Sequence, residues 1–187
     1  MKIDNRIEKV LINERKINKA INKVAQWINQ NFKDKNLVLV TILKGSIPFV
    51  GALIPKIKVD FTIDYISISS FKGERRAITE PEIINFLSND VKGKDILLVE
   101  DIVDSGKTIK LVLDTLKKTN CNSCQLVTLL DKPKGRVVDL KPNYVCFDID
   151  LEFVVGFGLD YKEKFRNLPY IGILKKEYIH QMEDDYE

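Results

Sequence analysis

One stretch of this sequence constrains the fold more than any other: the apolar run from Ile96 to Val99, which stops at two acids, Glu100 and Asp101. A third acid follows at Asp104, and behind it an apolar periodicity typical of a helix begins. We therefore predict a buried strand, a turn and a helix. In open α/β sheets, ligands bind where a strand's carboxyl end leads into a helix, because the first helical amides lack partners. The junction thus predicts an anion site.

The turn at this junction has the composition of a phosphate cradle. Its residues are Ser105, Gly106, Lys107 and Thr108. They offer small side chains, hydroxyls and a glycine that tolerates an unusual φ, so a phosphate can lie among their N–H groups. The competing prediction, a nucleoside-triphosphate P-loop, requires a glycine where this chain has Asp101. The acids suit a sugar instead, because Glu100 and Asp101 can bind vicinal hydroxyls or face a magnesium ion, which prefers oxygen ligands.

A second junction follows the predicted buried strand from Leu37 to Ile42 and reads Leu43-Lys44-Gly45-Ser46-Ile47-Pro48. Ser46 can cap a helix, proline is tolerated in a first helical turn, and Gly45 lets backbone come close to a ligand. Taken alone, the segment also fits an ordinary turn.

The remaining patterns predict alternating helices and strands. One helix follows Asn13 as its cap, and two helical stripes are expected in the core. The first stripe is Ile17, Ala20, Ile21, Val24 and Ile28, and the second is Ile109, Val112, Leu113 and Leu116. Further strands are predicted at residues 60–70 and 125–130.

Two positions near the predicted strand ends stay open on pattern alone. Lys132 follows the strand at 125–130, so it is either a solvated surface lysine or a donor aimed into the site. The stretch from Phe153 to Tyr161 predicts a strand with an end broken by glycines, with Phe153 in the core.

Residues 71–90 do not resemble core, because they are mostly polar and carry only four apolar anchors, Ile83, Ile84, Phe86 and Leu87. A long polar insertion in a compact domain is usually a mobile functional loop, and we predict one here.

Size and charge exclude several classes of protein. A chain of 187 residues with 44% hydrophobic content predicts one domain, residues 1–187, with a sizeable core. Neither a membrane span nor a signal-peptide core is evident, so we expect a cytoplasmic protein that contacts no membrane. The net charge of +3 is modest and its charges are interleaved, which argues against nucleic acid as a partner.

The cysteines allow two interpretations. Cys121 and Cys124 form a C-x-x-C, which could be a redox pair or half of a zinc site. Only Cys146 and the single histidine, His180, remain as further soft ligands, so free thiols in a reducing cytosol are the better prediction.

The segment from Val99 to Thr108 resembles the phosphoribosyl-pyrophosphate signature of type I phosphoribosyltransferases, and in detail that of hypoxanthine-guanine phosphoribosyltransferases. The resemblance implies the α/β fold of that family, a mainly parallel twisted sheet flanked by helices, with a small hood and a mobile active-site loop. It continues at 43–46, at 131–132 and at 153–166, in the family's order.

By this resemblance, each matching residue acquires an expected role. Glu100 and Asp101 bind the ribose hydroxyls and magnesium, and the segment from Asp104 to Thr108 binds the 5'-phosphate. Asp104 also lies beside purine N7 as the catalytic base. The pyrophosphate residues are Lys44, Gly45 and Arg166, with a Leu43-Lys44 peptide that is often cis in the family.

The resemblance also implies how the base is recognised. Lys132 contacts the 6-oxo group, Phe153 stacks on the base, Val154 presents backbone groups, and Asp160 reaches a second magnesium ion through its waters. The lid begins Ser-Tyr in the family, whereas this chain has Ser70-Phe71, which loses a hydroxyl but keeps an aromatic ring.

Together these matches predict a purine salvage enzyme of the 6-oxopurine branch, with Mg²⁺ as cofactor. It is expected to transfer the 5-phosphoribosyl group from phosphoribosyl pyrophosphate to N9 of hypoxanthine, and of guanine, giving IMP or GMP. Two alternatives stay open, a phosphoribosyl-pyrophosphate-sensing regulator that binds nucleic acid and a transferase for xanthine. A homodimer or homotetramer is expected from the family.

Overall fold

The computed structural model describes residues 3–69 and 81–178. Within these ranges the chain forms, in order, β1 (Ile7–Ile12), α1 (Glu14–Asn31), β2 (Leu37–Leu43), α2 (Ile47–Leu53), η1 (Ile54–Lys56), β3 (Phe61–Ser69), β4 (Glu82–Asn85), β5 (Asp95–Val103), α3 (Lys107–Lys117), β6 (Ser123–Asp131), η2 (Pro133–Gly135), β7 (Tyr144–Asp148), β8 (Val154–Val155) and β9 (Ile171–Leu174). The predicted alternation of strands and helices is confirmed.

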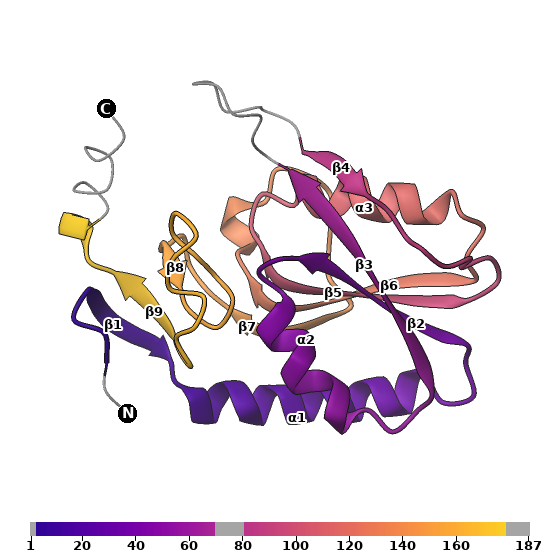
Figure 1. Ribbon diagram of the computed structural model, residues 1–187, viewed down its shortest axis with the longest axis horizontal. Coiled ribbons are helices and arrows are strands. Elements are labelled where there is room, and N and C mark those ends of the chain that lie inside the picture. Colours follow the sequence, from indigo (N-terminus) through magenta and orange to yellow (C-terminus); the bar gives the residue numbers. More distant parts are fainter. Residues whose placement is uncertain (1–2, 70–80, 179–187) are drawn as a thin grey trace.

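The main sheet has the strand order β4-β3-β2-β5-β6-β7 (Figure 1). All neighbouring pairs are parallel except β3 with the edge strand β4. From β2 the chain moves to one side, to β3 and β4, and then returns to the other side, to β5, β6 and β7. The order therefore reverses between β2 and β5, and in open α/β sheets ligands bind at such a switch point.

Both faces of the central strands are buried, because successive side chains of a strand point to opposite faces. On β5, Leu97 and Val99 belong to a core cluster that includes α1 and α2, whereas Ile96 and Leu98 belong to a second cluster that includes α3. All residues of both predicted helical stripes are buried. Asn13 caps α1 as predicted, because its Oδ1 accepts a hydrogen bond from the amide of Lys16 at 2.9 Å.

A second, antiparallel sheet, β1-β9-β8, lies apart from the main sheet, on the left of Figure 1. It joins the two ends of the described chain, since β1 pairs with β9 and β9 with β8. It carries its own small core around Tyr170 and Phe165. We call this part the hood.

Three expectations need correction. The polar loop predicted at 71–90 does not extend over that whole range, because Glu82–Asn85 forms β4 and pairs with the end of β3. Residues 70–80, including the lid positions Ser70 and Phe71, lie outside the described residues. Ser46 does not cap α2 with its side chain: its hydroxyl accepts a hydrogen bond from Thr41 and donates to the carbonyl of Ile42. Phe153 is not in the core but 45% exposed.

The three cysteines, Cys121, Cys124 and Cys146, are free thiols, as predicted. Burial raises the pKa of Cys124 and of Cys146 to about 12, so neither is a ready thiolate. The only histidine, His180, lies outside the described residues. Across residues 3–69 and 81–178, every helix is too short or too polar to span a membrane.

Candidate active site

Three loops leave the main sheet side by side at the carboxyl ends of β2, β5 and β6. In β5 and β6 the last paired residues are Val103 and Asp131, and the two strands run parallel. Because β2 also pairs in parallel with β5, the turn at Lys44 opens at the same edge of the sheet. The segments predicted separately from sequence therefore meet at the switch point.

The phosphate cradle has the predicted strand, turn and helix. Gly106 directly precedes α3 in the left-handed region, at φ +82°, where a side chain would be strained. A Cβ there would also come within 2.7 Å of Cδ of Arg136 and 2.8 Å of Cγ2 of Val138. Glycine is thus required for both conformation and space, and the amides of the first turn of α3 can receive an anion.

Glu100 and Asp101 are almost fully buried, at 8% and 7% exposure, within β5. Burial raises the pKa of Glu100 well above its usual value, and the neighbouring Asp101 adds to this effect. Burial also raises the pKa of Asp101, although hydrogen bonds and Arg166 oppose the rise. Oε2 of Glu100 is buried without a hydrogen-bond partner among the described residues. Such an orphaned carboxylate oxygen beside a second carboxylate fits a hard divalent cation or a pair of sugar hydroxyls.

Gly45 lies against this acid pair. A Cβ on Gly45 would come within 1.8 Å of Oδ2 of Asp101. The preceding peptide bond, Leu43-Lys44, is cis. Gly158 of the hood, at φ +101°, packs on the other side, because a Cβ there would meet the carbonyl oxygen of Gly45 at 1.9 Å. At Gly45 and Gly158 the turn and the hood therefore meet backbone to backbone.

Two cations next to this turn share one carboxylate. Oε2 of Glu163 lies 3.2 Å from Nζ of Lys44 and 3.2 Å from Nη2 of Arg166. Hydrogen bonds from Lys44, and then from Arg166, lower the pKa of Glu163. Arg166 also donates to the carbonyl of Gly158 at 2.8 Å and pairs with Asp160 at 2.9 Å. An anion can be held here, since Lys44 and Arg166 already converge on one.

The other side of the site is built from the end of β6 and the hood. Lys132 is 7% exposed, so it is not a solvated surface lysine, and its Nζ lies 3.0 Å from Oδ2 of Asp104. The ring of Phe153 meets the ring of Tyr161 edge to face at 5.4 Å. A cavity joins these parts, lined by the predicted residues Asp101, Asp104, Lys132, Phe153, Val154 and Asp160 and by Ile102 and Leu159.

Comparison with known proteins agrees with this geometry. Residues 10–162 match the model of the phosphoribosyl transferase domain family. A hypoxanthine-guanine phosphoribosyltransferase of Streptococcus pneumoniae is 44% identical over 175 residues, which cover 94% of this chain and 97% of the relative. The chain belongs to the hypoxanthine-guanine phosphoribosyltransferase family.

Solved structures of this phosphoribosyltransferase family have the same fold. A hypoxanthine phosphoribosyltransferase of Staphylococcus aureus superposes with a TM-score of 0.88 at 41% identity, covering 93% of this chain and 95% of that one. The Trypanosoma cruzi hypoxanthine phosphoribosyltransferase gives a TM-score of 0.91 at 30% identity, covering 98% and 100%. The predicted fold class is confirmed.

Some residues of this phosphoribosyltransferase site were not predicted. Glu163 carries no pattern of its own, and only its spacing of three residues from Arg166 hinted at a pairing. Ile102 and Leu159 line the cavity but look like ordinary core positions in the sequence. Arg136, which contacts the cradle from behind, follows no predicted strand end, so only the fold reveals it.

The buried acid pair generates a prediction about stability. Because the pKa of Glu100 is raised in the folded protein, the unfolded chain loses this proton first as pH rises, and folding is penalised at neutral pH. Without added metal, Glu100→Gln should therefore raise the free energy of unfolding at pH 7 by about 1 to 3 kcal/mol. The gain should vanish as pH falls below about 4, where both states are protonated. Urea denaturation at several pH values measures it.

Asp95 supplies a matched control in the same strand. It is equally buried, but its carboxylate accepts hydrogen bonds from Asn122 at 2.9 Å and Ser123 at 2.5 Å. Asp95→Asn should therefore destabilise the protein. Equal destabilisation by both substitutions at pH 7 would show that the Glu100 carboxylate is satisfied.

Proposed function

We propose that this protein transfers the 5-phosphoribosyl group from phosphoribosyl pyrophosphate to N9 of hypoxanthine and of guanine, releasing pyrophosphate. The observation that carries the proposal is that one cavity at the switch point is lined by Asp101 of the buried acid pair, by Asp104, which directly precedes the phosphate cradle, and by Lys132. The names of the relatives agree with this reaction.

The cradle and the acids hold the sugar. The amides after Asp104 receive the 5'-phosphate at the start of α3. Glu100 and Asp101 accept hydrogen bonds from the ribose hydroxyls, and Oε2 of Glu100 is an acceptor with no partner in the described chain. These contacts to the phosphate and the ribose orient the anomeric carbon toward the purine.

The same two carboxylates, Glu100 and Asp101, would hold Mg²⁺. Among the described residues no three acids, histidines or cysteines gather at one point, so the ion would take its other ligands from substrate oxygens and water. When bound, Mg²⁺ neutralises charge on the pyrophosphate. Asp160, which we also propose to act through a magnesium ion's waters, pairs with Arg166 in this structure.

Departure of the leaving group builds negative charge on pyrophosphate and positive charge on the sugar. Lys44, the backbone at Gly45 and Arg166 are the groups we assign to the pyrophosphate, since both cations already converge on a carboxylate there. Fixed donors of this kind stabilise developing charge best where water is excluded. We propose that the lid beginning at Ser70 and Phe71 supplies that exclusion.

The base lies between Lys132 and the hood. Asp104 is 54% exposed at its side chain and can accept the N7 proton as N9 attacks, while its partner Lys132 donates to the 6-oxo group. We assign stacking on the ring to Phe153, which is exposed and lines the cavity, and backbone contacts to Val154, which lines it too.

A homodimer or homotetramer is part of the proposal. Ile47, Ile63 and Tyr65 are 54%, 47% and 44% exposed, and the two β3 residues lie on one face of that strand. These apolar side chains are available for contact with a second copy.

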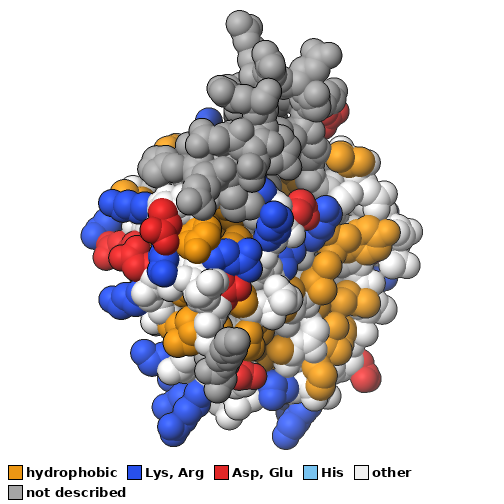
Figure 2. Space-filling model, turned by 60° about the vertical axis from the view of Figure 1, so that its left-hand side comes forward, with side chains coloured by type: hydrophobic (Ala, Val, Ile, Leu, Met, Phe, Trp, Pro, Cys, Tyr) orange, Lys and Arg blue, Asp and Glu red, His pale blue; other side chains and the backbone are white. Residues whose placement is uncertain are grey.

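One assay tests the function directly. The protein is incubated with Mg²⁺, phosphoribosyl pyrophosphate and one base at a time, and nucleotide is measured by chromatography. Hypoxanthine and guanine should be converted. Conversion of xanthine alone would assign the other transferase activity. Binding of phosphoribosyl pyrophosphate without conversion of any purine would favour a sensor. A sensor that binds nucleic acid needs a basic face, whereas basic and acidic side chains are interspersed on the face in Figure 2.

Asp104→Asn tests the assignment of the base. The amide keeps the shape of the carboxylate but cannot take up the N7 proton, so kcat should fall about 10²- to 10⁴-fold. The KM for phosphoribosyl pyrophosphate should change little. Asp150→Asn, at an exposed acid paired with Lys134, is the control and should keep full turnover. Full turnover of Asp104→Asn would remove this residue from the chemistry.

Lys132→Ala tests selectivity between purines. A 6-oxo group accepts the lysine's hydrogen bond, whereas the 6-amino group of adenine presents another donor and leaves a buried charge unpaired. That mismatch costs about 1 to 3 kcal/mol, so the preference for hypoxanthine over adenine in kcat/KM should fall about 10- to 100-fold. Lys134→Ala, in the same turn but exposed, should leave the preference intact. An unchanged ratio for Lys132→Ala would contradict the assignment.

A further inference from the structure

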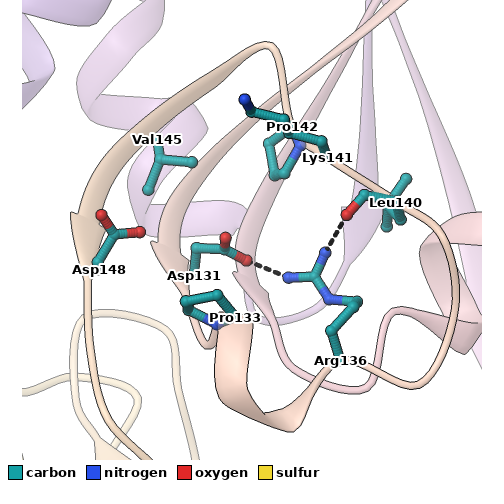
Figure 3. Close-up of a pocket in the computed structure, with 8 residues that line it drawn as sticks. All are labelled: Asp131, Pro133, Arg136, Leu140, Lys141, Pro142, Val145 and Asp148. Atoms are coloured by element: carbon teal, nitrogen blue, oxygen red, sulfur yellow. Dashed lines mark hydrogen bonds and ion pairs between the residues drawn. The ribbon is translucent and has the colours of Figure 1, made fainter.

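Arg136 makes four side-chain hydrogen bonds next to the cradle. Its Nε donates to the carbonyl of Asp104 at 3.0 Å, and its Nη1 donates to the carbonyl of Leu140 at 2.8 Å. Its Nη2 donates to the carbonyl of Val103 at 3.4 Å and pairs with the carboxylate of Asp131 (Figure 3). The side chains of Arg136 and Asp131 are only 11% and 9% exposed.

These contacts join two parts of the site that come from different strands. Val103 and Asp104 are the residues through which β5 enters the cradle, and Asp131 ends β6 immediately before Lys132. The main chain adds two bonds between the same segments, from the amide of Lys132 to the carbonyl of Val103 at 2.9 Å and from the amide of Val137 to the carbonyl of Ser105 at 3.0 Å.

Arg136 also forms the rear wall of the cradle. Its Cδ fills the space that a side chain on Gly106 would need. The cavity in Figure 3, which Arg136 lines with Pro133 and Lys141, shares no residue with the cavity between Lys132 and the hood. Arg136 therefore lies outside the cavity that contains Lys132.

Only a guanidinium group can make this set of contacts. Its planar fork has five N–H donors in fixed directions, whereas an ammonium group is a single point of charge at the end of a flexible stem. Lysine at position 136 could neutralise Asp131 but could not also reach the carbonyls of Val103, Asp104 and Leu140.

We propose that Arg136 is a positioning residue that fixes the phosphate cradle and Lys132 relative to each other. The inference rests on the proposed function, in which the cradle binds the 5'-phosphate of the nucleotide and Lys132 binds the base at the other end of the same nucleotide. Arg136 thereby sets the distance across which the nucleotide is held. It makes no hydrogen bond to the turn at Lys44 and Gly45, so the pyrophosphate side is independent of it.

The test compares Arg136→Lys and Arg136→Gln with the unmodified protein. Calorimetry measures binding of two probes, ribose 5-phosphate and inorganic pyrophosphate with Mg²⁺, and kinetics give KM for phosphoribosyl pyrophosphate. A misplaced cradle should weaken ribose 5-phosphate binding and raise this KM about 10- to 100-fold in both variants. Pyrophosphate binding should stay within about twofold, since the groups that bind it are untouched.

Two further variants sharpen the result. Lys134→Gln removes a cation from the same turn, but one that is exposed and pairs with the exposed Asp150, so both probes should bind as before. Adding guanidinium ion to Arg136→Ala should restore ribose 5-phosphate binding in part, and no restoration in a folded variant would refute the role of the guanidinium contacts.

The outcomes separate the two proposals. If the unmodified protein does not bind ribose 5-phosphate, the proposed function fails. If it binds and Arg136→Lys binds equally well, or if both probes weaken equally, the role of Arg136 is refuted. If the Arg136 variants do not fold, Asp131→Asn is the deciding variant, because it weakens one contact of Arg136 and keeps the backbone hydrogen bonds. This substitution should weaken the binding of ribose 5-phosphate and leave that of pyrophosphate unchanged. No change in the binding of ribose 5-phosphate would refute the role of Arg136.

Discussion

The structure depends on β5 being buried on both faces up to the point where two carboxylates interrupt it. Helices on either side of the sheet exclude water from Ile96 to Val99, so polar groups on this strand can work only at its carboxyl end. Glu100 and Asp101 stand at that end, in surroundings that disfavour their ionised forms. A cation or a set of hydroxyls relieves this penalty, so the packing of the core itself creates the demand for a ligand.

The charges of the remaining site are balanced within the chain. Glu163 lies between Lys44 and Arg166, Asp160 also pairs with Arg166, and Asp104 pairs with Lys132. Each cation assigned to the substrates thus has an internal acid as partner, and the side chains of two of these acids, Asp104 and Glu163, are more than half exposed. The pair between Lys44 and Glu163 is exposed on both sides and therefore weak, so an incoming phosphate can replace it at small cost.

The sequence predicted those parts of the site whose residues are close together in the chain. The cradle was readable because an apolar run, an acid pair and a glycine follow one another within a few residues, and their conformations are as expected. The order of the strands was not readable, although it alone brings Lys44, Asp104 and Lys132 to one edge. Edge strand β4 was missed because its side chains are mostly exposed and alternate weakly. Arg136 was missed because its partners are mainly backbone carbonyls, which leave no mark in a sequence.

At the contact between Gly45 and Gly158, the hood meets the turn after β2 backbone to backbone, with no room for a side chain between them. A backbone contact this close leaves little space for the hood to move without the turn. On the proposed assignment, a change in the hood that alters the pocket for the purine would also displace the peptide assigned to the leaving group. Base preference and the geometry of bond cleavage would then be coupled through this one contact.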